Sequence, residues 1–204
     1  MRPITKYPKG VAKQEELVDV ALQVIAERGY NGATLAEVAE AANLSRAGLL
    51  HHFRKKEDLF AEVLRRRDEL ATGRWLQEQN APTVDRAELI AGFIRENAKI
   101  PGLVQLFSRL SAEATDPANP AHEFFRDRYE QNKLASTAML REMRDEGRIP
   151  LAADPEKFAI ILAALEDGLQ IRWLYDPSID MADLVEEFFA ALAGRVAEGS
   201  ADRM

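Results

Sequence analysis

The sequence predicts an all-α protein, and three observations lead to that fold class. Apolar residues recur at spacings of three and four in most segments of the chain, as they do on one face of a helix. No segment shows the strict alternation of apolar and polar residues that indicates a strand, and no internal repeat occurs. Clusters of Pro, Gly and Asn separate the periodic segments, so the 204 residues divide into about nine helices.

The chain opens with a tail, residues 1–10, that contains Pro and Lys. Its three basic residues fit two roles, contact with a minor groove of DNA or simple solubilisation. A helix is expected from Val11 to Arg28, because its apolar residues share one face, and Gly29 follows as the residue that ends it.

Two short helices joined by a tight turn follow between Thr34 and Phe53. Thr34 and Glu37 have the spacing of a capping box at the start of the first helix. Asn43 tolerates the left-handed backbone that a sharp turn requires, and Ser45 is an N-cap for the second helix. This arrangement is typical of a helix-turn-helix, whose second helix enters the major groove of DNA.

The second helix carries polar side chains that favour DNA binding over a purely structural helix pair. Residues 45–56 contain four Lys or Arg and no acid. Gly48 costs about 1 kcal/mol relative to Ala inside a helix, so it needs a reason. Close approach of the sugar-phosphate backbone and tight packing against a neighbouring helix are both possible reasons.

Six further helices are expected in the remainder of the chain, separated by loops that contain Pro, Gly or Asn. The helix that begins near Lys56 is the expected mechanical link between the two halves of the protein. The expected ranges are 56–79, 84–99, 103–114, 121–146, 155–175 and 181–198.

The net charge of −7 is unevenly distributed along the chain. The first 60 residues contain nine Lys or Arg and eight Asp or Glu, whereas the remainder contains eighteen and twenty-six. An acidic remote half is compatible with DNA binding, because affinity depends on the local surface that faces the phosphates.

Several classes of protein are disfavoured by what the sequence lacks. There is no cysteine, which excludes disulfides and thiolate metal sites. No signal peptide or membrane-spanning apolar run is present, so the cytoplasm is the expected compartment. No Glu-x-x-His pair, His-Glu-x-x-His or phosphate loop occurs, and adjacent His51 and His52 point about 100° apart on a helix. No catalytic residue, metal or cofactor is therefore expected; a small helical enzyme is the less favoured alternative.

The segment from Ser45 to Leu59 combines a serine-led helix with Phe53, Lys56 and Leu59 at fixed spacing. In this it resembles the TetR family of transcriptional regulators, over about residues 11–63. Family members usually carry Tyr where this chain has Leu50, which cannot donate a hydrogen bond to a phosphate but can touch a thymine methyl group.

The C-terminal half resembles the more variable regulatory half of such proteins. Residues 168–177 look like the end of the penultimate helix in the betaine-inhibitor repressor subgroup. The resemblance implies a helix-turn-helix DNA-binding domain over residues 1–56 and a helical regulatory and dimerisation domain over residues 57–204.

The function that the resemblance implies is that of a ligand-responsive regulator, a repressor above all, which binds a pseudo-palindromic operator as a homodimer. Its partners would be double-stranded DNA, a second copy of the chain and a small-molecule effector, with no membrane. A helical protein that binds DNA without sequence selection is the main alternative. The expected DNA-binding residues are Thr34, Ser45, Arg46, Ala47, Gly48, Leu50, His51, His52, Lys55 and Lys56.

The last two helices carry broad apolar faces, and the first of them is apolar nearly all round. Burial within one chain explains one apolar stripe, and pairing with a symmetry-related copy as a four-helix bundle explains the surplus. The expected interface residues are Leu162, Leu165, Leu169, Trp173, Leu184, Phe188 and Leu192.

Aromatic residues are frequent between the DNA-binding helices and the dimerisation helices. In the TetR family this region encloses a pocket, although aromatic residues at helical spacing also fill ordinary cores. A ligand there would favour a dimer whose recognition helices do not fit successive grooves, and DNA would oppose ligand binding equally. The expected pocket residues are Trp75, Phe93, Leu103, Phe107, Leu110, Phe125 and Tyr129.

Overall fold

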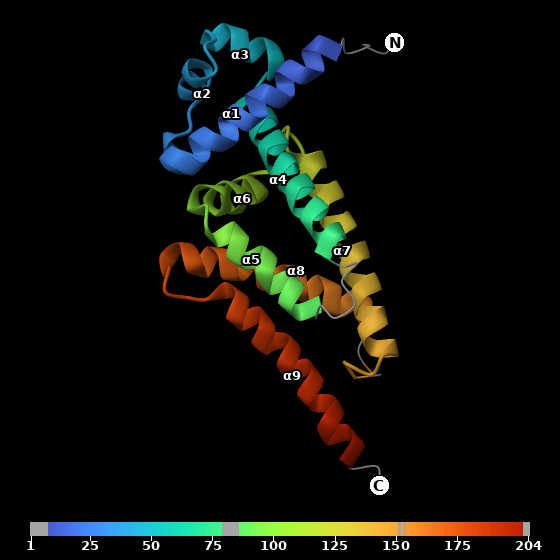
Figure 1. Ribbon diagram of the computed structural model, residues 1–204. Helices are drawn as coiled ribbons and strands as arrows, with labels where there is room; N and C mark the ends of the chain where they lie inside the picture. Colours follow the sequence, from blue (N-terminus) through green and yellow to red (C-terminus); the bar gives the residue numbers. More distant parts are fainter. Residues whose placement is uncertain (1–7, 79–85, 151, 153, 202–204) are drawn as a thin grey trace. The chain divides into compact units, whose positions relative to one another are not determined.

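The computed structural model describes residues 8–78, 86–150, 152 and 154–201, without the side chains of residues 8, 9, 11, 71–78, 86 and 194–201. Within these ranges the chain forms nine helices and no strand, which confirms the all-α prediction (Figure 1). The helices are α1 Pro8–Gly32, α2 Leu35–Ala41, α3 Arg46–His52, α4 Lys56–Glu78, α5 Arg86–Ala98, α6 Pro101–Glu113, α7 His122–Asp145, α8 Pro155–Tyr175 and α9 Met181–Ala201.

Side-chain caps begin both short helices. The Glu37 N–H donates to the Thr34 hydroxyl oxygen at 3.2 Å, and the Thr34 N–H donates to a Glu37 carboxylate oxygen at 2.9 Å. These two bonds are the predicted capping box at the start of α2. At the start of α3, the Ser45 hydroxyl oxygen accepts a hydrogen bond of 3.1 Å from the Gly48 N–H. Both predicted caps are confirmed.

The turn between α2 and α3 depends on a left-handed residue. Asn43 has a φ of 55°, as predicted for this position. The Leu44 N–H then donates to the Ala39 carbonyl at 2.8 Å, and the Ala42 N–H donates to the Val38 carbonyl at 3.0 Å. These bonds occupy carbonyl groups that the end of α2 would otherwise leave unpaired.

Three helix ends show how local rules operate. Gly29, with a φ of 70° and a ψ of 175°, breaks α1 where its end was expected, but helical residues resume as far as Gly32. Gly147, with a φ of 74°, follows α7 as predicted. Pro101 was expected in the break between two helices, and instead it is the first residue of α6. Proline fits that position because the first helical residue needs no N–H donor.

The chain forms two compact units. Unit 1 comprises the chain as far as Arg74 together with Ile100–His122, and unit 2 comprises Trp75–Lys99 and the chain from Glu123 onward. Unit 1 therefore contains α6 as well as α1 to α3 and most of α4. The division at residue 56 expected from the sequence concerns function, and it stays a prediction.

In unit 1, α1 packs against both α2 and α6, and α2 packs against α3. The contact between α1 and α6 is close at Gly102, where a Cβ atom would lie 2.4 Å from the Ile25 carbonyl oxygen and 3.0 Å from the Gly29 Cα. A glycine is thus required there for the two backbones to approach. The largest fully buried side chains of this unit are Leu17, Ile25, Val38, Leu49, Leu59, Phe60, Leu64, Leu106, Phe107 and Leu110.

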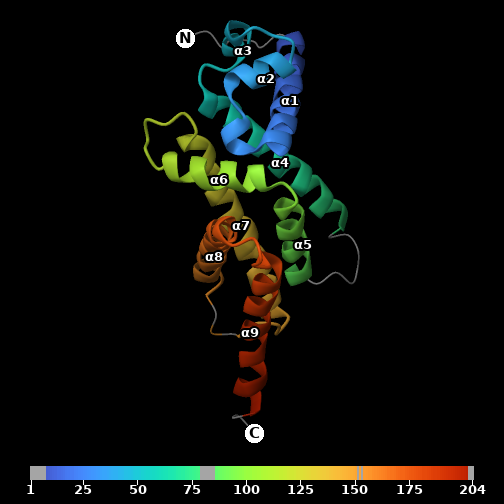
Figure 2. The same cartoon turned by 90° about the vertical axis from the view of Figure 1, so that its left-hand side faces the viewer.

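In unit 2, α9 packs against α5 and α8 (Figure 2). Its core joins residues of α7, α8 and α9 with Ile149 from the loop after α7, and the apolar face of α5 packs against it. The members of this core are Leu140, Met143, Ile149, Ala159, Leu162, Val185, Phe189 and Leu192. No helix in the described ranges is both long enough and apolar enough to cross a membrane.

The close approach at Gly102 makes a stability prediction. Gly102→Ala places a methyl group against backbone atoms of α1, which cannot move aside as a flexible side chain could. We expect the free energy of unfolding to fall by about 1–3 kcal/mol. Gly92→Ala in α5 is the matched control, because nothing lies within 4 Å of its added Cβ; Ala there should gain about 0.5–1 kcal/mol. Urea unfolding followed by circular dichroism measures both, and equal stability of the two variants would contradict the prediction.

The capping box predicts a pH dependence. The hydrogen bond from the Thr34 N–H, followed by that from its hydroxyl group, lowers the pKa of Glu37 below its ordinary value of 4.5. A lowered folded-state pKa contributes stability above the unfolded value, and that contribution is lost as the pH falls through the folded value. Glu37→Gln should therefore be less stable than the wild type at pH 7, and the gap should close progressively below pH 4.5.

Unfolding midpoints in urea, measured from pH 7 downward, test this pH dependence. Glu40→Gln is the matched control, since Glu40 is an exposed carboxylate on the same helix and outside the capping box. A constant difference between wild type and Glu37→Gln across the pH range would show that the carboxylate charge is not what the cap uses.

Candidate nucleic-acid interface

Helix α3 has one buried side and one open side. Leu49 is fully buried and Phe53, which follows the helix, is 4% exposed, so these two side chains fix α3 to the rest of unit 1. Arg46, Ala47 and His51 are exposed on the other side. The predicted base-contacting residue Arg46 is therefore accessible to a partner outside the chain.

Most of the remaining predicted DNA-contact residues lie in α3 or directly beside it in the chain, whereas Thr34 is the N-cap of α2. Ser45, Thr34 and Lys55 are exposed, and the main-chain N–H of Lys55 donates to an Asp58 carboxylate oxygen at 3.0 Å. Leu50 and His52 are half-buried. The rings of His51 and His52 are 5.6 Å apart in an edge-to-face arrangement, so they form one aromatic surface at the end of α3.

Gly48 has room for a Cβ atom within its own chain. A Cβ added there would lie 3.4 Å from the Ser45 hydroxyl oxygen and 3.7 Å from the Leu44 Cβ, which are ordinary contact distances. Packing within the chain therefore does not require a glycine at this position. Close approach of the sugar-phosphate backbone, the other reason considered from the sequence, stays a prediction.

Gln14 of α1 positions α3 and was not singled out from the sequence. Its side-chain amide donates a hydrogen bond of 3.1 Å to the main-chain carbonyl of His52, the last residue of α3. The two residues are 38 positions apart, so no local pattern indicates this contact. It satisfies a carbonyl that the C-terminus of a helix leaves unpaired.

Lys56 contacts aromatic rings at the start of α4. Its ammonium nitrogen lies 4.7 Å from the ring centroid of Tyr30 and 4.8 Å from that of Phe60. Such cation–π contacts give Lys56 a structural role inside unit 1. The phosphate contact predicted for Lys56 stays a prediction beside that role.

Arg109 of α6 completes this cluster. Its guanidinium lies 5.0 Å from the Tyr30 ring centroid, and it donates a hydrogen bond of 2.9 Å to the Asn31 side-chain oxygen. Burial raises the pKa of Tyr30, and the nearby charge of Glu113 raises it further, so its hydroxyl stays neutral. Helices α1, α4 and α6 are thereby joined around one aromatic ring.

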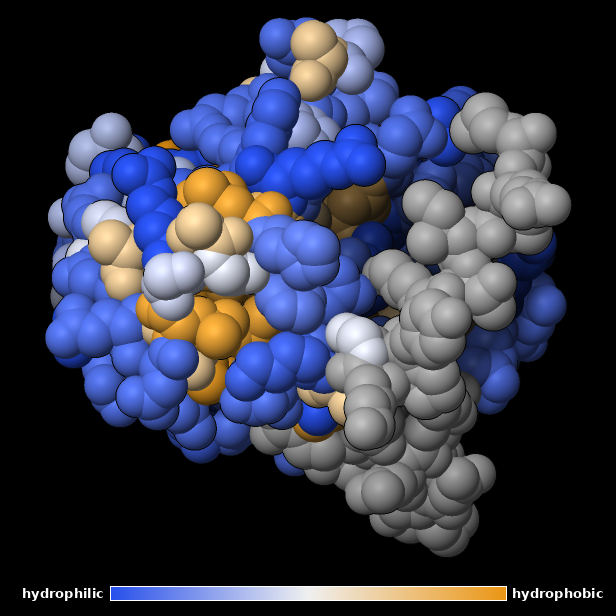
Figure 3. All heavy atoms as spheres, turned by 90° about the horizontal axis from the view of Figure 1, so that it is seen from above, coloured by the Kyte–Doolittle hydropathy of each residue, from blue (hydrophilic) through white to orange (hydrophobic). Residues whose placement is uncertain are grey.

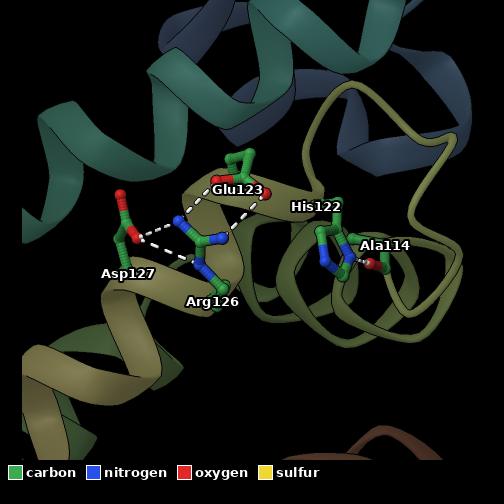
Figure 4. Close-up of polar contacts among 5 residues, drawn as sticks. All are labelled: Ala114, His122, Glu123, Arg126 and Asp127. Carbon is green, nitrogen blue, oxygen red and sulfur yellow. Dashed lines mark hydrogen bonds and ion pairs between the residues drawn. The ribbon is translucent and has the colours of Figure 1, made fainter.

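The polar residues near the start of α7 form hydrogen bonds and ion pairs within the chain (Figure 4). The His122 Nδ1 lies 2.8 Å from the Ala114 carbonyl oxygen, a contact within unit 1 (Figure 4). In unit 2, Arg126 donates hydrogen bonds to Glu123 and Asp127 at 3.0 Å and 3.1 Å, all three being exposed. Among the residues that the structure describes, no three His, Cys, Asp or Glu lie close enough to hold a metal ion.

The surface is consistent with a polar partner. In the space-filling view from above, most of the described atoms belong to hydrophilic residues, and apolar residues show in several patches between them (Figure 3). This is the side on which Figure 1 shows α3. A mostly hydrophilic face with an accessible Arg46 can present charged and polar groups to phosphates and base edges.

The residues predicted to line a pocket are divided between the units. Leu103, Phe107 and Leu110 lie in α6 and are each at most 3% exposed in the core of unit 1. Their burial agrees with ordinary core packing, the alternative to pocket lining that the sequence left open. Unit 2 contains the others that are described, Phe93, Phe125 and Tyr129. The side chain of Trp75 lies outside the described residues.

Two of the residues predicted for a dimer interface are buried in their own chain. Leu162 and Leu192 belong to the core of unit 2, which leaves little of either side chain for a partner. Leu165, Leu169 and Phe188 are half-buried against that core, Trp173 is half-buried, and Leu184 is exposed. The surplus apolar residues of α8 are on its open side: Ile160, Ile161, Ile171 and Tyr175 are all exposed.

Comparison with known proteins identifies the helix-turn-helix. The family of bacterial regulatory proteins named tetR matches residues 17–63. The chain is 27% identical over 186 residues to the HTH-type transcriptional repressor AcnR of Corynebacterium efficiens, a match that covers 87% of this chain and 93% of the relative. It is 22% identical to the HTH-type transcriptional repressor KstR2 of Mycolicibacterium smegmatis, with 94% of each protein covered.

Solved structures share the fold over most of the chain. The fatty acid degradation regulator FadR of Bacillus halodurans superposes with a TM-score of 0.68 at 19% identity, covering 93% of this chain and 96% of that one. The matched segment contains α2, α3 and the caps of both, and its alignment with full-length repressors extends beyond it. These matches support a TetR-family transcriptional regulator, with the family's N-terminal helix-turn-helix over residues 17–63.

Proposed function

We propose that the protein is a ligand-responsive transcriptional repressor that binds a pseudo-palindromic DNA operator as a homodimer. The observation that carries the proposal is the geometry of α3. A capped seven-residue helix buries Leu49 and leaves Arg46, Ala47 and His51 exposed, so that one side is free to enter a major groove. The repressors among its relatives support the same function.

The side chains of α3 and those near it would have different roles in binding DNA. Arg46 is the residue suited to a bidentate contact with guanine, because its guanidinium matches the two acceptors on the major-groove edge of that base. Ser45, Thr34, Lys55 and the histidines would contact phosphates, which fixes the register without reading sequence. Leu50 offers an apolar contact to a thymine methyl group in place of the usual tyrosine hydroxyl.

The open side of α8 supports a homodimer. Ile160, Ala164, Gly168, Ile171 and Tyr175 are all exposed and follow one another at spacings of four, four, three and four, which places them on one stripe of the helix. No atom lies within 4 Å of a Cβ added at Gly168, so the backbone there is open to a neighbouring helix. A continuous apolar stripe on a monomer marks an interaction surface.

The dimer connects this stripe to DNA recognition. A two-fold pair places two α3 helices in successive major grooves, about 34–36 Å apart, and so selects an operator with matching symmetry. An effector acts by favouring a dimer in which that spacing is wrong, and its differential affinity for the two states limits how far it releases DNA.

Substitution of Arg46 separates specific from non-specific DNA binding. Arg46→Ala should lose discrimination between the selected operator and a scrambled duplex by roughly 1–3 kcal/mol, because the base contact is removed. Arg46→Lys is the matched control: it keeps the positive charge, so non-specific affinity and its salt dependence should survive while discrimination falls. Fluorescence anisotropy with duplexes obtained by in vitro selection measures both. Undiminished discrimination in Arg46→Ala would assign base recognition to other residues, whereas equal affinity of the wild type for both duplexes would favour DNA binding without sequence selection.

A charge placed in the apolar stripe on α8 tests the proposed dimer interface. Ile171→Glu places a charge in the proposed interface, and the dimer dissociation constant should rise by at least about tenfold. Leu134→Glu is the matched control, since Leu134 is equally an exposed apolar residue, 60% exposed, but lies on α7. Sedimentation velocity over a concentration series gives the dissociation constants. A dimer unaffected by Ile171→Glu, or weakened as much by Leu134→Glu, would locate the interface elsewhere.

A further inference from the structure

Helix α3 is connected to a different helix at each of its ends. Its start follows directly on the turn from α2, where the Leu44 N–H donates to the Ala39 carbonyl at 2.8 Å. Its last residue, His52, accepts a hydrogen bond of 3.1 Å from the side-chain amide of Gln14 in α1. The first end is thus held by α2, and the position of the second end depends on α1.

Helix α1 gives that hydrogen bond a firm support. Leu17 and Ala21, about one and two turns after Gln14, are fully buried in unit 1. Farther along the same helix, the Ile25 carbonyl lies against Gly102 of α6. Gln14 itself is half-buried. Because α1 is held along its length, the Gln14 amide is a fixed point to which the end of α3 is attached.

A small displacement at the end of α3 changes the direction of the whole helix. Seven residues with a rise of 1.5 Å each make α3 about 10 Å long, so a shift of about 1 Å at His52 turns the helix axis by about 5° around its start. The exposed side chains of α3 turn with it. Hydrogen bonds to base edges weaken steeply when their angle is wrong, whereas attraction to phosphates is long-range and tolerates such shifts.

We propose that Gln14 is a positioning residue for sequence recognition, which acts through α3 and not through a base contact of its own. Its hydrogen bond to the His52 carbonyl holds the exposed side chains of α3 at the angle that base contacts require. This inference rests on the proposed function, because it concerns how the same helix reads an operator. The alternative is that Gln14 stabilises unit 1 as a whole, and the two roles lead to different results.

Gln14→Met tests the role in the full-length protein, because methionine has a similar length and lacks the donor. The ratio of affinities for the in vitro selected operator and a scrambled duplex should fall by about 2- to 10-fold, as for one lost hydrogen bond. Affinity for the scrambled duplex and its salt dependence should match the wild type. Gln23→Met, at an exposed position of the same helix, is the matched control and should bind as the wild type does. An unchanged ratio, or an equal fall in both affinities, would overturn the proposal.

Two charged variants provide a rescue that depends on the donor alone. Gln14→Lys keeps a donor, and a cation suits the carbonyl end of a helix, which is its negative end. Gln14→Glu at neutral pH has no donor and places a negative charge at that end. The added charge acts on both duplexes and so cancels in their affinity ratio, which should stay near the wild-type value in Gln14→Lys and fall in Gln14→Glu. Equal ratios in the two variants would count against a role for the hydrogen bond.

Hydrogen exchange shows whether α3 itself is loosened, and it requires no DNA. The Phe53 N–H donates to the Leu49 carbonyl at 3.0 Å at the end of α3, and in Gln14→Met it should exchange about 2- to 10-fold faster. The Ala42 N–H, which donates to the Val38 carbonyl at the end of α2, should exchange as in the wild type. Equal acceleration at both positions would indicate a general loss of stability and would refute the positioning role.

These measurements also separate the inference from the proposed function. Equal affinity of the wild type for every duplex would refute the sequence-specific repressor, while the exchange rate of the Phe53 N–H would still decide whether Gln14 fixes the end of α3. Wild-type discrimination in Gln14→Met, together with an unchanged exchange rate at Phe53, would refute the positioning role and leave the repressor standing.

Discussion

A helix of seven residues is too short to be stable in water by itself, and the recognition surface of this protein is built on such a helix. Everything that α3 exposes therefore depends on what holds it from the other side. Leu49 and Phe53 bury its apolar face, the Ser45 hydroxyl accepts a hydrogen bond from the Gly48 N–H in its first turn, and the Gln14 side chain of α1 donates to its last carbonyl. With both ends and one face fixed, the remaining side chains are free to face a partner in a defined orientation.

Contacts between distant residues also hold the rest of unit 1 together. The Tyr30 ring is contacted by Lys56 of α4 and Arg109 of α6, while Gly102 lets α6 approach the backbone of α1. Helix α6 is thereby part of the body that carries α3, although α5, which precedes it in the chain, belongs to unit 2. The polypeptide passes between the two units at residues 74–75, 99–100 and 122–123. A ligand bound in unit 2 could change the spacing of the recognition helices through these three covalent connections.

Local features of this structure could be predicted from sequence, and contacts between distant residues could not. The caps at Thr34 and Ser45, the left-handed Asn43 and the nine helices of the described residues follow from rules that span a few residues. The Gln14–His52 hydrogen bond joins residues 38 positions apart, and the same is true of Tyr129 with Asp167. Periodicity also shows that α8 is apolar nearly all round without showing which side is covered. For that reason Leu162 of α8 was expected at an interface and is found in the core, as is Leu192 of α9.

The place of α6 in unit 1 has a consequence for building hybrid regulators. An exchange that grafts the first 56 residues onto another sensor would leave behind the helix whose Gly102 fits against Ile25 and whose Arg109 covers Tyr30. The transplanted N-terminal segment would then expose the side of α1 that α6 normally covers. A modular swap that respects the packing has to carry residues 100–122 along with the N-terminal segment, and so must be cut at three points rather than one.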